Sequence, residues 1–340
     1  MLQKKSKYNL AIVGATGAVG TEMIRLVEER NFPVEKIKIL ASKKSLDKKL
    51  TISGHETLVE ELRENSFSGI DIALFSAGST ISQKFAPLAV KAGAIVIDNS
   101  STFRMDPKVP LIVPEVNPHD LKNHKGLIAN PNCTTIIMAV AIFPIHKINP
   151  IKKITVASYQ AVSGAGARAL QELREQQTQI LKGQTPDAKV FRYVIANNIF
   201  SHDSEVAQNG YNKEEIKMIE ETKKIFGNPN LAINPTCIRV PIERAHSEAI
   251  ILELTNPADE DLIRHTLAKS PGIKVVDDRE KNYFPMPCEA SHQNDVLVGR
   301  IRKDLTDERH LNLFVCGDQL LKGAALNALQ IAELLISSRG

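Results

Sequence analysis

The chain has 340 residues, of which 43% are hydrophobic and 24% charged, and its formal net charge of +4 is small for that length. This composition is typical of a soluble globular protein of about two domains, and it gives no support for a nucleic-acid or membrane-surface partner. No run approaches the roughly 20 apolar residues of a membrane helix, and the four scattered cysteines form no zinc-type pairs. We therefore expect a cytoplasmic protein with reduced thiols and no metal site.

The first third of the chain alternates short apolar strands with helical segments. Strands are expected at residues 9–13, 37–41, 70–76 and 94–97, with one helix after the glycine-rich turn at 14–20 and another at 84–92. This alternation is typical of a parallel sheet that is buried on both faces. It predicts a Rossmann-type, doubly wound α/β domain.

A glycine-rich turn connects the first expected strand to the following helix, with the sequence Gly14-Ala15-Thr16-Gly17-Ala18-Val19-Gly20. Glycines there let backbone amides approach a pyrophosphate, although a plain tight connection is an equally good reading of the turn alone. After the second strand comes Ser42-Lys43-Lys44-Ser45, with no acid for a ribose hydroxyl. Cations and hydroxyls at this place favour NADP over NAD. The alternative is a solvated basic loop.

The pattern of apolar and polar residues changes after Asn132. Residues 134–145 are almost continuously apolar and predict a buried helix with Cys133 near its first turn. Beyond it, longer strands alternate with amphipathic helices, which predicts an α+β domain on a mixed or antiparallel sheet. The strands are expected at 154–160, 249–254, 296–301 and 311–316, and the helices at 167–181, 213–226 and 259–268. A last helix, at 323–337, is expected to return to the first domain.

These patterns give two domains, one of residues 1–132 with 320–340 and one of residues 133–319. The first is the predicted NADP-binding domain. The second is predicted to hold the catalytic residues, because it begins at a cysteine whose thiolate a helix N-terminus would stabilise. A buried, inert cysteine is the alternative, and we accept it for the other three cysteines.

Two further segments carry polar groups suited to chemistry. The segment from Ser158 to Gly166 ends a strand in a turn of small residues, where side chains and bare backbone can face a ligand. The segment from Arg239 to Glu248 carries an arginine suited to binding a carboxylate and a histidine, His246, suited to act as a general base. Alone, an arginine is more often half of an ion pair and a histidine more often structural.

Taken together and in order, five motifs resemble the aspartate-semialdehyde dehydrogenase family. They are the glycine-rich turn, Asn130 to Thr135, Ser158 to Gly166, Arg239 to Glu248, and Asp318 to Ala325. The resemblance implies that Cys133 is the acyl-thioester nucleophile, His246 the proton acceptor and Gln160 the residue that orients the substrate. It also implies that Arg239 binds the substrate carboxylate.

The resemblance implies further binding roles. Arg104 and Lys217 correspond to cations that bind phosphate, and Glu214 to an acid that receives the substrate amino group; from the residues alone, Glu214 and Lys217 read as a surface ion pair. The residues implied for NADP are Thr16, Gly17, Ala18, Val19, Lys44, Ser45, Ser163, Gly164 and Gln319. Many family members carry arginine where this chain has Lys44, which leaves the strength of NADP preference open.

The implied reaction is the reversible, NADPH-dependent conversion of L-4-aspartyl phosphate to L-aspartate 4-semialdehyde and phosphate. It would feed the biosynthesis of lysine through diaminopimelate and of threonine, isoleucine and methionine, in a homodimer or a dimer of dimers. One rival is a reductase resembling N-acetyl-glutamyl-phosphate reductase, whose acylated substrate would have no use for Glu214. Another is a catalytically silent relative that only binds nucleotide or a partner.

Overall fold

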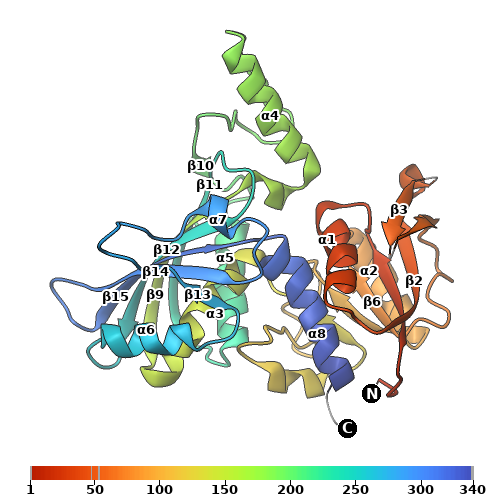
Figure 1. Ribbon diagram of the computed structural model, residues 1–340, viewed down its shortest axis with the longest axis horizontal. Helices are drawn as coiled ribbons and strands as arrows, with labels where there is room; N and C mark the ends of the chain where they lie inside the picture. The colour runs from red at the N-terminus through yellow and green to blue at the C-terminus, as the bar shows by residue number, and fades with distance from the viewer. Residues whose placement is uncertain (1, 47, 53, 338–340) are drawn as a thin grey trace. The chain divides into compact units, whose positions relative to one another are not determined.

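The computed structural model describes residues 2–46, 48–52 and 54–337, which form two compact units (Figure 1). One unit takes residues 1–132 and 324–340, and the other takes residues 133–323. The sequence interpretation set the return to the first unit at residue 320, four residues earlier. The chain up to Gly323 stays with the second unit because the Gly323 N–H donates to the Asp318 carbonyl at 3.0 Å and Gly323 lies directly against Cys133.

The N-terminal unit is built on a six-stranded sheet whose neighbouring strands are all parallel, in the order β5-β2-β1-β6-β7-β8. This confirms the predicted doubly wound fold. The strands are β1 (Tyr8–Val13), β2 (Val34–Ala41), β5 (Glu60–Glu61), β6 (Ile72–Phe75), β7 (Ile95–Asp98) and β8 (Leu127–Ala129). The helices are α1 (Ala18–Glu29), α2 (Ser79–Lys91) and α8 (Leu326–Ser337), and a hairpin joins β3 (Lys49–Ile52) to β4 (His55–Leu58).

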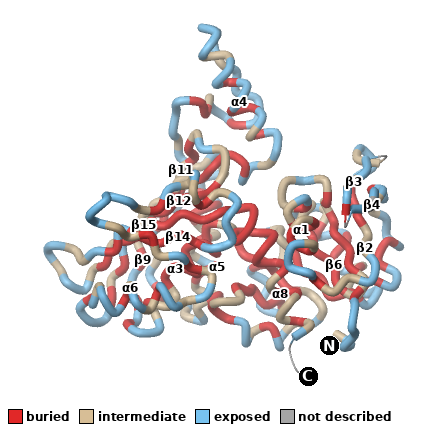
Figure 2. Tube along the Cα trace, viewed as in Figure 1, coloured by how far each residue is buried: buried red, intermediate tan, exposed pale blue. Residues whose placement is uncertain are grey.

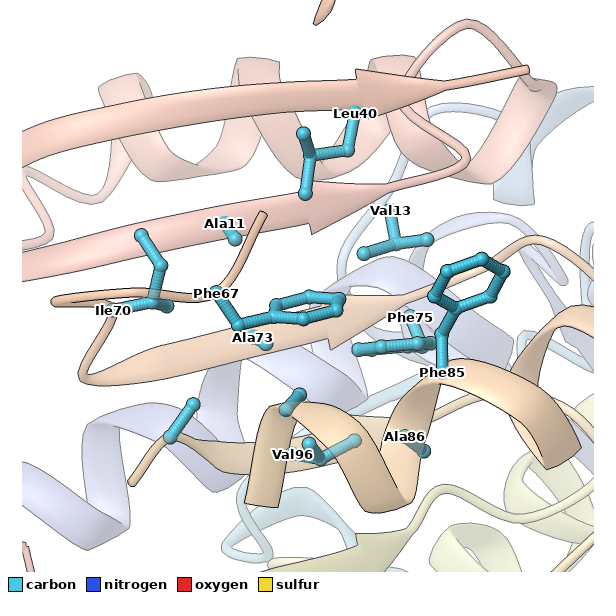
Figure 3. Close-up of a cluster of buried hydrophobic side chains, with 12 residues drawn as sticks. Ala11, Val13, Leu40, Phe67, Ile70, Ala73, Phe75, Phe85, Ala86 and Val96 are labelled. Carbon is cyan, nitrogen blue, oxygen red and sulfur yellow. The ribbon is translucent and has the colours of Figure 1, made fainter. Parts of the chain in front are cut away.

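One core cluster fixes the ends of the central strands in this unit. Figure 3 shows Val13 of β1 and Phe75 of β6 facing Phe85 of α2, and the rings of Phe67 and Phe75 stack with centroids 5.7 Å apart. Burying a side chain of this size contributes roughly 1.5–3 kcal/mol to folding. The cluster therefore holds the carboxyl ends of β1 and β6 in place, and the glycine-rich turn begins at the first of them.

The second unit is built on a seven-stranded mixed sheet in the order β10-β11-β9-β12-β15-β14-β13. Figure 2 shows buried chain running through its strands. This confirms the predicted mixed sheet. The strands are β9 (Ile151–Gln160), β10 (Phe200–Ser201), β11 (Ala232–Arg239), β12 (His246–Leu254), β13 (Ile273–Val275), β14 (Val296–Lys303) and β15 (His310–Gly317). The helices are α3 (Cys133–Ile148), α4 (Ala167–Leu181), α5 (Lys213–Ile225), α6 (Glu260–Ala268) and α7 (Pro287–Ala290).

Strand β11 was missing from the sequence interpretation because Asn234 and Pro235 interrupt its pattern. Both residues are poor strand formers, and proline cannot donate to a ladder. The strand forms because β9 pairs with it in parallel along its whole length, whereas β10 pairs only with Ile238 and Arg239. Pro235 therefore lies in the part of β11 that pairs only with β9. The absence of a backbone N–H there removes little stabilisation from the sheet.

Helix α3 is buried along most of its length and contacts β9, β14 and β15. This confirms the predicted buried helix and places Cys133 at its first residue. Within the described residues, no helix combines the length and apolar character that crossing a membrane would require.

Candidate active site

Cys133 is half-buried at the N-terminus of α3, where the helix dipole favours a thiolate. Its Sγ lies 3.4 Å from Nε2 of His246. Gly323 makes room for the cysteine, because a Cβ at that position would lie 2.8 Å from the Cys133 Cβ. Burial instead raises the pKa of Cys237 far above its usual range and that of Cys316 to about 12, so these thiols stay protonated.

His246 is the first residue of β12 and is fully enclosed. Burial, with the charge of Arg239, lowers its pKa to about 3, so the ring is neutral near pH 7. Its Nδ1 accepts the Ala161 N–H at 3.0 Å, which leaves the single proton of the neutral ring on Nε2, facing the cysteine sulfur. Gly164 is close to the ring, since a Cβ there would lie 3.2 Å from Cε1 of His246.

Gln160 and Arg239 are the last residues of two parallel strands and are partners in register. Because parallel strands end at the same edge of a sheet, their side chains are delivered to one place. Nε2 of Gln160 donates to Thr134 Oγ1 at 3.0 Å, next to Cys133. Arg239 is 4% exposed, and its Nη1 donates to the Ala161 carbonyl at 3.3 Å. The structure therefore brings the cysteine, histidine, amide and guanidinium together.

Glu214 and Lys217 form the ion pair that their spacing predicts, with Nζ and Oε2 2.9 Å apart on α5. The pair is not an ordinary surface pair, because the Glu214 side chain is only 7% exposed. Its charge acts on the buried cluster, where it raises the pKa of both His202 and Arg239 against the effect of burial. Glu214 therefore belongs to the surroundings of Arg239.

Arg104 lies in the N-terminal unit and is buried. Its Nε donates to the Asn130 carbonyl at 2.9 Å and its Nη2 to the Asn99 carbonyl at 2.7 Å. Both carbonyls belong to loops that follow strands of the six-stranded sheet, so the guanidinium is held rigidly beside the carboxyl ends of β7 and β8. Its predicted phosphate contact stays a prediction.

A pocket of about 400 Å³ opens at the glycine-rich turn of the N-terminal unit. It lies where the order of the sheet reverses between β1 and β6, the usual place for a nucleotide. Gly14, at φ +83°, is required there because a Cβ would lie 2.2 Å from the Ser76 carbonyl oxygen. Gly17 precedes α1, and no side-chain cap is formed there among the described residues, so the amides of the helix can face an anion.

The predicted cofactor residues fall into two groups. Thr16, Gly17, Ala18 and Val19 form the turn and the start of α1, and Thr16 Oγ1 is 3.2 Å from Ser45 Oγ in the short turn that also holds Lys44. The pocket itself is lined by Lys43 and by Glu61, an acid brought in by β5 that the sequence interpretation did not consider.

The second group lies beside His246. Nε2 of Gln319 donates to Ser163 Oγ at 2.5 Å, and its Oε1 accepts the Ala245 N–H at 2.8 Å. Gln319 also lies close to Gly164, because Cγ of Gln319 is 3.8 Å from the position that a Cβ on residue 164 would occupy. These three residues therefore form one wall next to His246. Among the described residues, no group of histidine, cysteine and acidic side chains could hold a metal ion.

Two residues that contact these side chains were not identified as site residues from the sequence. Thr134 holds the Gln160 amide, and His202 lies 2.9 Å from the Arg239 guanidinium. Thr134 adjoins Cys133, the predicted nucleophile, and could have been found by that adjacency. His202 stands in an irregular stretch without a pattern, and only the pairing of β10 with β11 brings it to Arg239.

The comparisons with known proteins agree with this geometry. Residues 9–124 match the semialdehyde dehydrogenase NAD binding domain, and residues 142–322 match the semialdehyde dehydrogenase dimerisation domain. Aspartate-semialdehyde dehydrogenases of Synechocystis sp. and Bacillus subtilis are 51% and 47% identical to the chain, over 97% and 96% of it and 98% and 97% of their own lengths. The chain belongs to the aspartate-semialdehyde dehydrogenase family.

Solved structures of this family have the same fold. Aspartate semialdehyde dehydrogenase II of Vibrio cholerae is 42% identical and matches with a TM-score of 0.95 over 98% of this chain and all of that one. Its complex with ASA, also 42% identical, matches with a TM-score of 0.96 over 99% of this chain and 100% of that one. Family membership makes the chain an oxidoreductase that acts on an aldehyde group and carries a domain for a nicotinamide cofactor. The resemblance predicted from the motifs is thereby confirmed.

Proposed function

We propose that the chain catalyses the reversible, NADPH-dependent conversion of L-4-aspartyl phosphate to L-aspartate 4-semialdehyde and phosphate, through a thioester on Cys133. The observation that carries this proposal is the 3.4 Å approach of Cys133 Sγ to His246 Nε2 at a helix N-terminus, with Gln160 and Arg239 beside it. The ASA complex of the Vibrio cholerae relative supports the same substrate.

The Cys133 thiolate attacks the acyl carbon of the aspartyl phosphate and expels phosphate, which leaves the thioester. When bound, NADPH supplies the hydride that reduces this thioester. The resulting alkoxide expels the Cys133 thiolate and gives the aldehyde. His246, neutral with its proton on Nε2, donates a hydrogen bond to the thiolate and to the oxygen that becomes negative at the same carbon. This proposal replaces the proton-acceptor role that the family resemblance implies, because a protonated Nε2 has no lone pair with which to accept the thiol proton.

The side chains around the reacting carbon have separate binding tasks. Arg239 takes the substrate carboxylate, since its planar guanidinium suits two-oxygen recognition. Gln160 orients the acyl group and is itself held by Thr134. Glu214 receives the substrate amino group, and Lys217 with Arg104 binds the phosphate. The buried setting of Glu214 supports this assignment over a purely surface role.

The glycine-rich turn and its pocket suit a dinucleotide, because the bare backbone at Gly14 and the uncapped start of α1 leave room and amides for a pyrophosphate. Lys43, Lys44 and Ser45 would receive the 2′-phosphate, which favours NADP. Glu61 also lines the pocket, but Arg63 is paired with it through two bonds to one carboxylate oxygen, at 2.8 and 3.0 Å. Ser163, Gly164 and Gln319 would place the nicotinamide end beside His246.

The physiological direction is reductive and supplies the lysine, threonine, isoleucine and methionine pathways, as the family implies. The match of residues 142–322 to a dimerisation domain supports a homodimer, or a dimer of dimers. The proposed compartment is the cytoplasm.

The test is phosphate-dependent reduction of NADP by aspartate semialdehyde. Cys133→Ala should abolish turnover and leave NADP binding nearly unchanged, whereas the matched control Cys288→Ala, at an exposed cysteine, should keep full activity. A thiol alkylator should inactivate the unaltered chain, and substrate should protect it. Phosphate-dependent NADPH formation that survives in Cys133→Ala would refute the thioester mechanism.

A further inference from the structure

His202 comes directly after β10 and lies against the guanidinium of Arg239. The antiparallel pairing of Phe200 with Arg239 starts this approach, and the His202 N–H continues it by donating to the Cys237 carbonyl at 2.8 Å. As a result, Nε2 of His202 lies 2.9 Å from Nη2 of Arg239. The contact is short and partly buried, so one of the two nitrogens must donate a hydrogen bond and the other must accept it.

The chemistry of the two groups decides which one donates. A guanidinium has only N–H donors, so Nε2 of His202 must accept and cannot carry a proton. The single proton of the neutral ring is then on Nδ1, where the Ser204 hydroxyl lies at 3.1 Å. The Ser204 N–H, 3.2 Å from the same nitrogen, is then a close contact and not a hydrogen bond, because both groups carry a proton. Protonation of the ring would add an N–H at Nε2, directly against the N–H of the Arg239 guanidinium.

We propose that neutral His202 is a positioning residue, which holds the Arg239 guanidinium in the orientation that binds the substrate carboxylate and releases it when the ring is protonated. This inference rests on the proposed function, because it needs a carboxylate substrate at Arg239. His202 acts only through Arg239, so its loss should weaken substrate binding and leave the chemistry at Cys133 unchanged.

The surroundings of His202 keep the ring neutral at working pH. Burial lowers the pKa of His202, and the positive charges of Arg239 on β11 and Lys217 on α5 lower it further. Glu214 on α5 and the neighbouring Asp203 act in the opposite direction. His246, on β12, also interacts electrostatically with the ring, and it is itself neutral. The balance favours a hydrogen-bond acceptor near pH 7 and a cation only in acid.

A second group of contacts explains why Arg239 needs this support. The Phe191 ring lies under the guanidinium, 5.3 Å from Cζ to the ring centroid, and allows it to slide in its own plane. The Asp203 carboxylate is 3.9 Å away, too far for a hydrogen bond, and Nε of Arg239 has no hydrogen-bond partner among the described residues. The bonds to Ala161 and His202 therefore fix the in-plane rotation of the group.

The experiment compares His202→Ala with His202→Gln, whose amide oxygen can replace Nε2 as an acceptor and does not titrate. Arg239→Lys serves as the positive control for lost carboxylate recognition, and His265→Gln, at an exposed histidine of α6, as the matched control. KM and kcat are measured for aspartate semialdehyde and for phosphate between pH 8 and pH 5, with NADP saturating. Circular dichroism checks that each variant is folded.

At pH 8, His202→Ala should raise the KM for the semialdehyde about tenfold, as expected for a lost hydrogen bond to a charged group. Its kcat and its KM for phosphate should change less than about twofold. His202→Gln should restore the semialdehyde KM. Because phosphate also changes protonation in this range, the informative quantity is the ratio of semialdehyde KM between His202→Gln and the unaltered chain, which should fall as pH falls.

Two results would overturn the inference while the proposed function stands. One is an unchanged semialdehyde KM in folded His202→Ala. The other is a KM ratio between His202→Gln and the unaltered chain that stays constant down to pH 5. If the unaltered chain does not turn over aspartate semialdehyde, the proposed function fails instead, and the inference fails with it.

Discussion

Acid should destabilise this protein in part because His246 is buried as a neutral ring. Its pKa is lowered from 6.5 to about 3 in the folded chain, mainly by burial. Between these values the unfolded chain binds a proton that the folded chain does not, so this contribution to stability is complete above pH 6.5 and is lost as pH falls toward 3. From pH 7 to pH 5 the loss amounts to about 2 kcal/mol.

The measurement compares urea unfolding of the unaltered chain and of His246→Asn at pH 7 and pH 5. Asparagine can still accept the Ala161 N–H through its side-chain oxygen, but it does not titrate. The free energy of unfolding should fall by about 2 kcal/mol more in the unaltered chain than in the variant. The other histidines are present in both proteins, so their contributions cancel. Equal losses would mean that His246 titrates near its ordinary pKa in the folded state, and the neutral-donor role proposed for it would be wrong.

Two other positions make separate predictions. Glu248 on β12 is fully buried, neither carboxylate oxygen has a partner among the described residues, and burial raises the pKa of the carboxyl well above 4.5. The free energy that this buried carboxyl costs the folded chain therefore grows as pH rises above 4.5, so Glu248→Gln should raise Tm more at pH 8 than at pH 5. An equal effect at both pH values would contradict the burial argument. Gly323→Ala would place a methyl group 2.8 Å from the Cys133 Cβ, so it should cost about 1–3 kcal/mol in urea unfolding and lower kcat. Full activity with unchanged stability would show that the α3 terminus can move aside.

Local pattern was enough to predict much of the fold. The glycine-rich turn between an apolar strand and an amphipathic helix predicts the dinucleotide domain, and the long apolar run after Cys133 predicts α3 and the position of Cys133 at its start. These elements could be predicted because their periodicity and turn chemistry are contained in short windows of sequence. Strand β11 could not, because Asn234 and Pro235 contradict local strand preference and only pairing with β9 overrides it.

The sequence by itself determined which residue types are present at the site and, through the family motifs, the order in which they occur. Only the tertiary structure decided that Cys133 and His246, 113 residues apart, lie 3.4 Å from each other, and that the ends of β9 and β11 deliver Gln160 and Arg239 to the same edge. It also decided the proton positions, because the Ala161 N–H fixes the tautomer of His246 and the guanidinium of Arg239 fixes that of His202. Such choices depend on neighbours brought by strand pairing, and a one-dimensional pattern does not contain them.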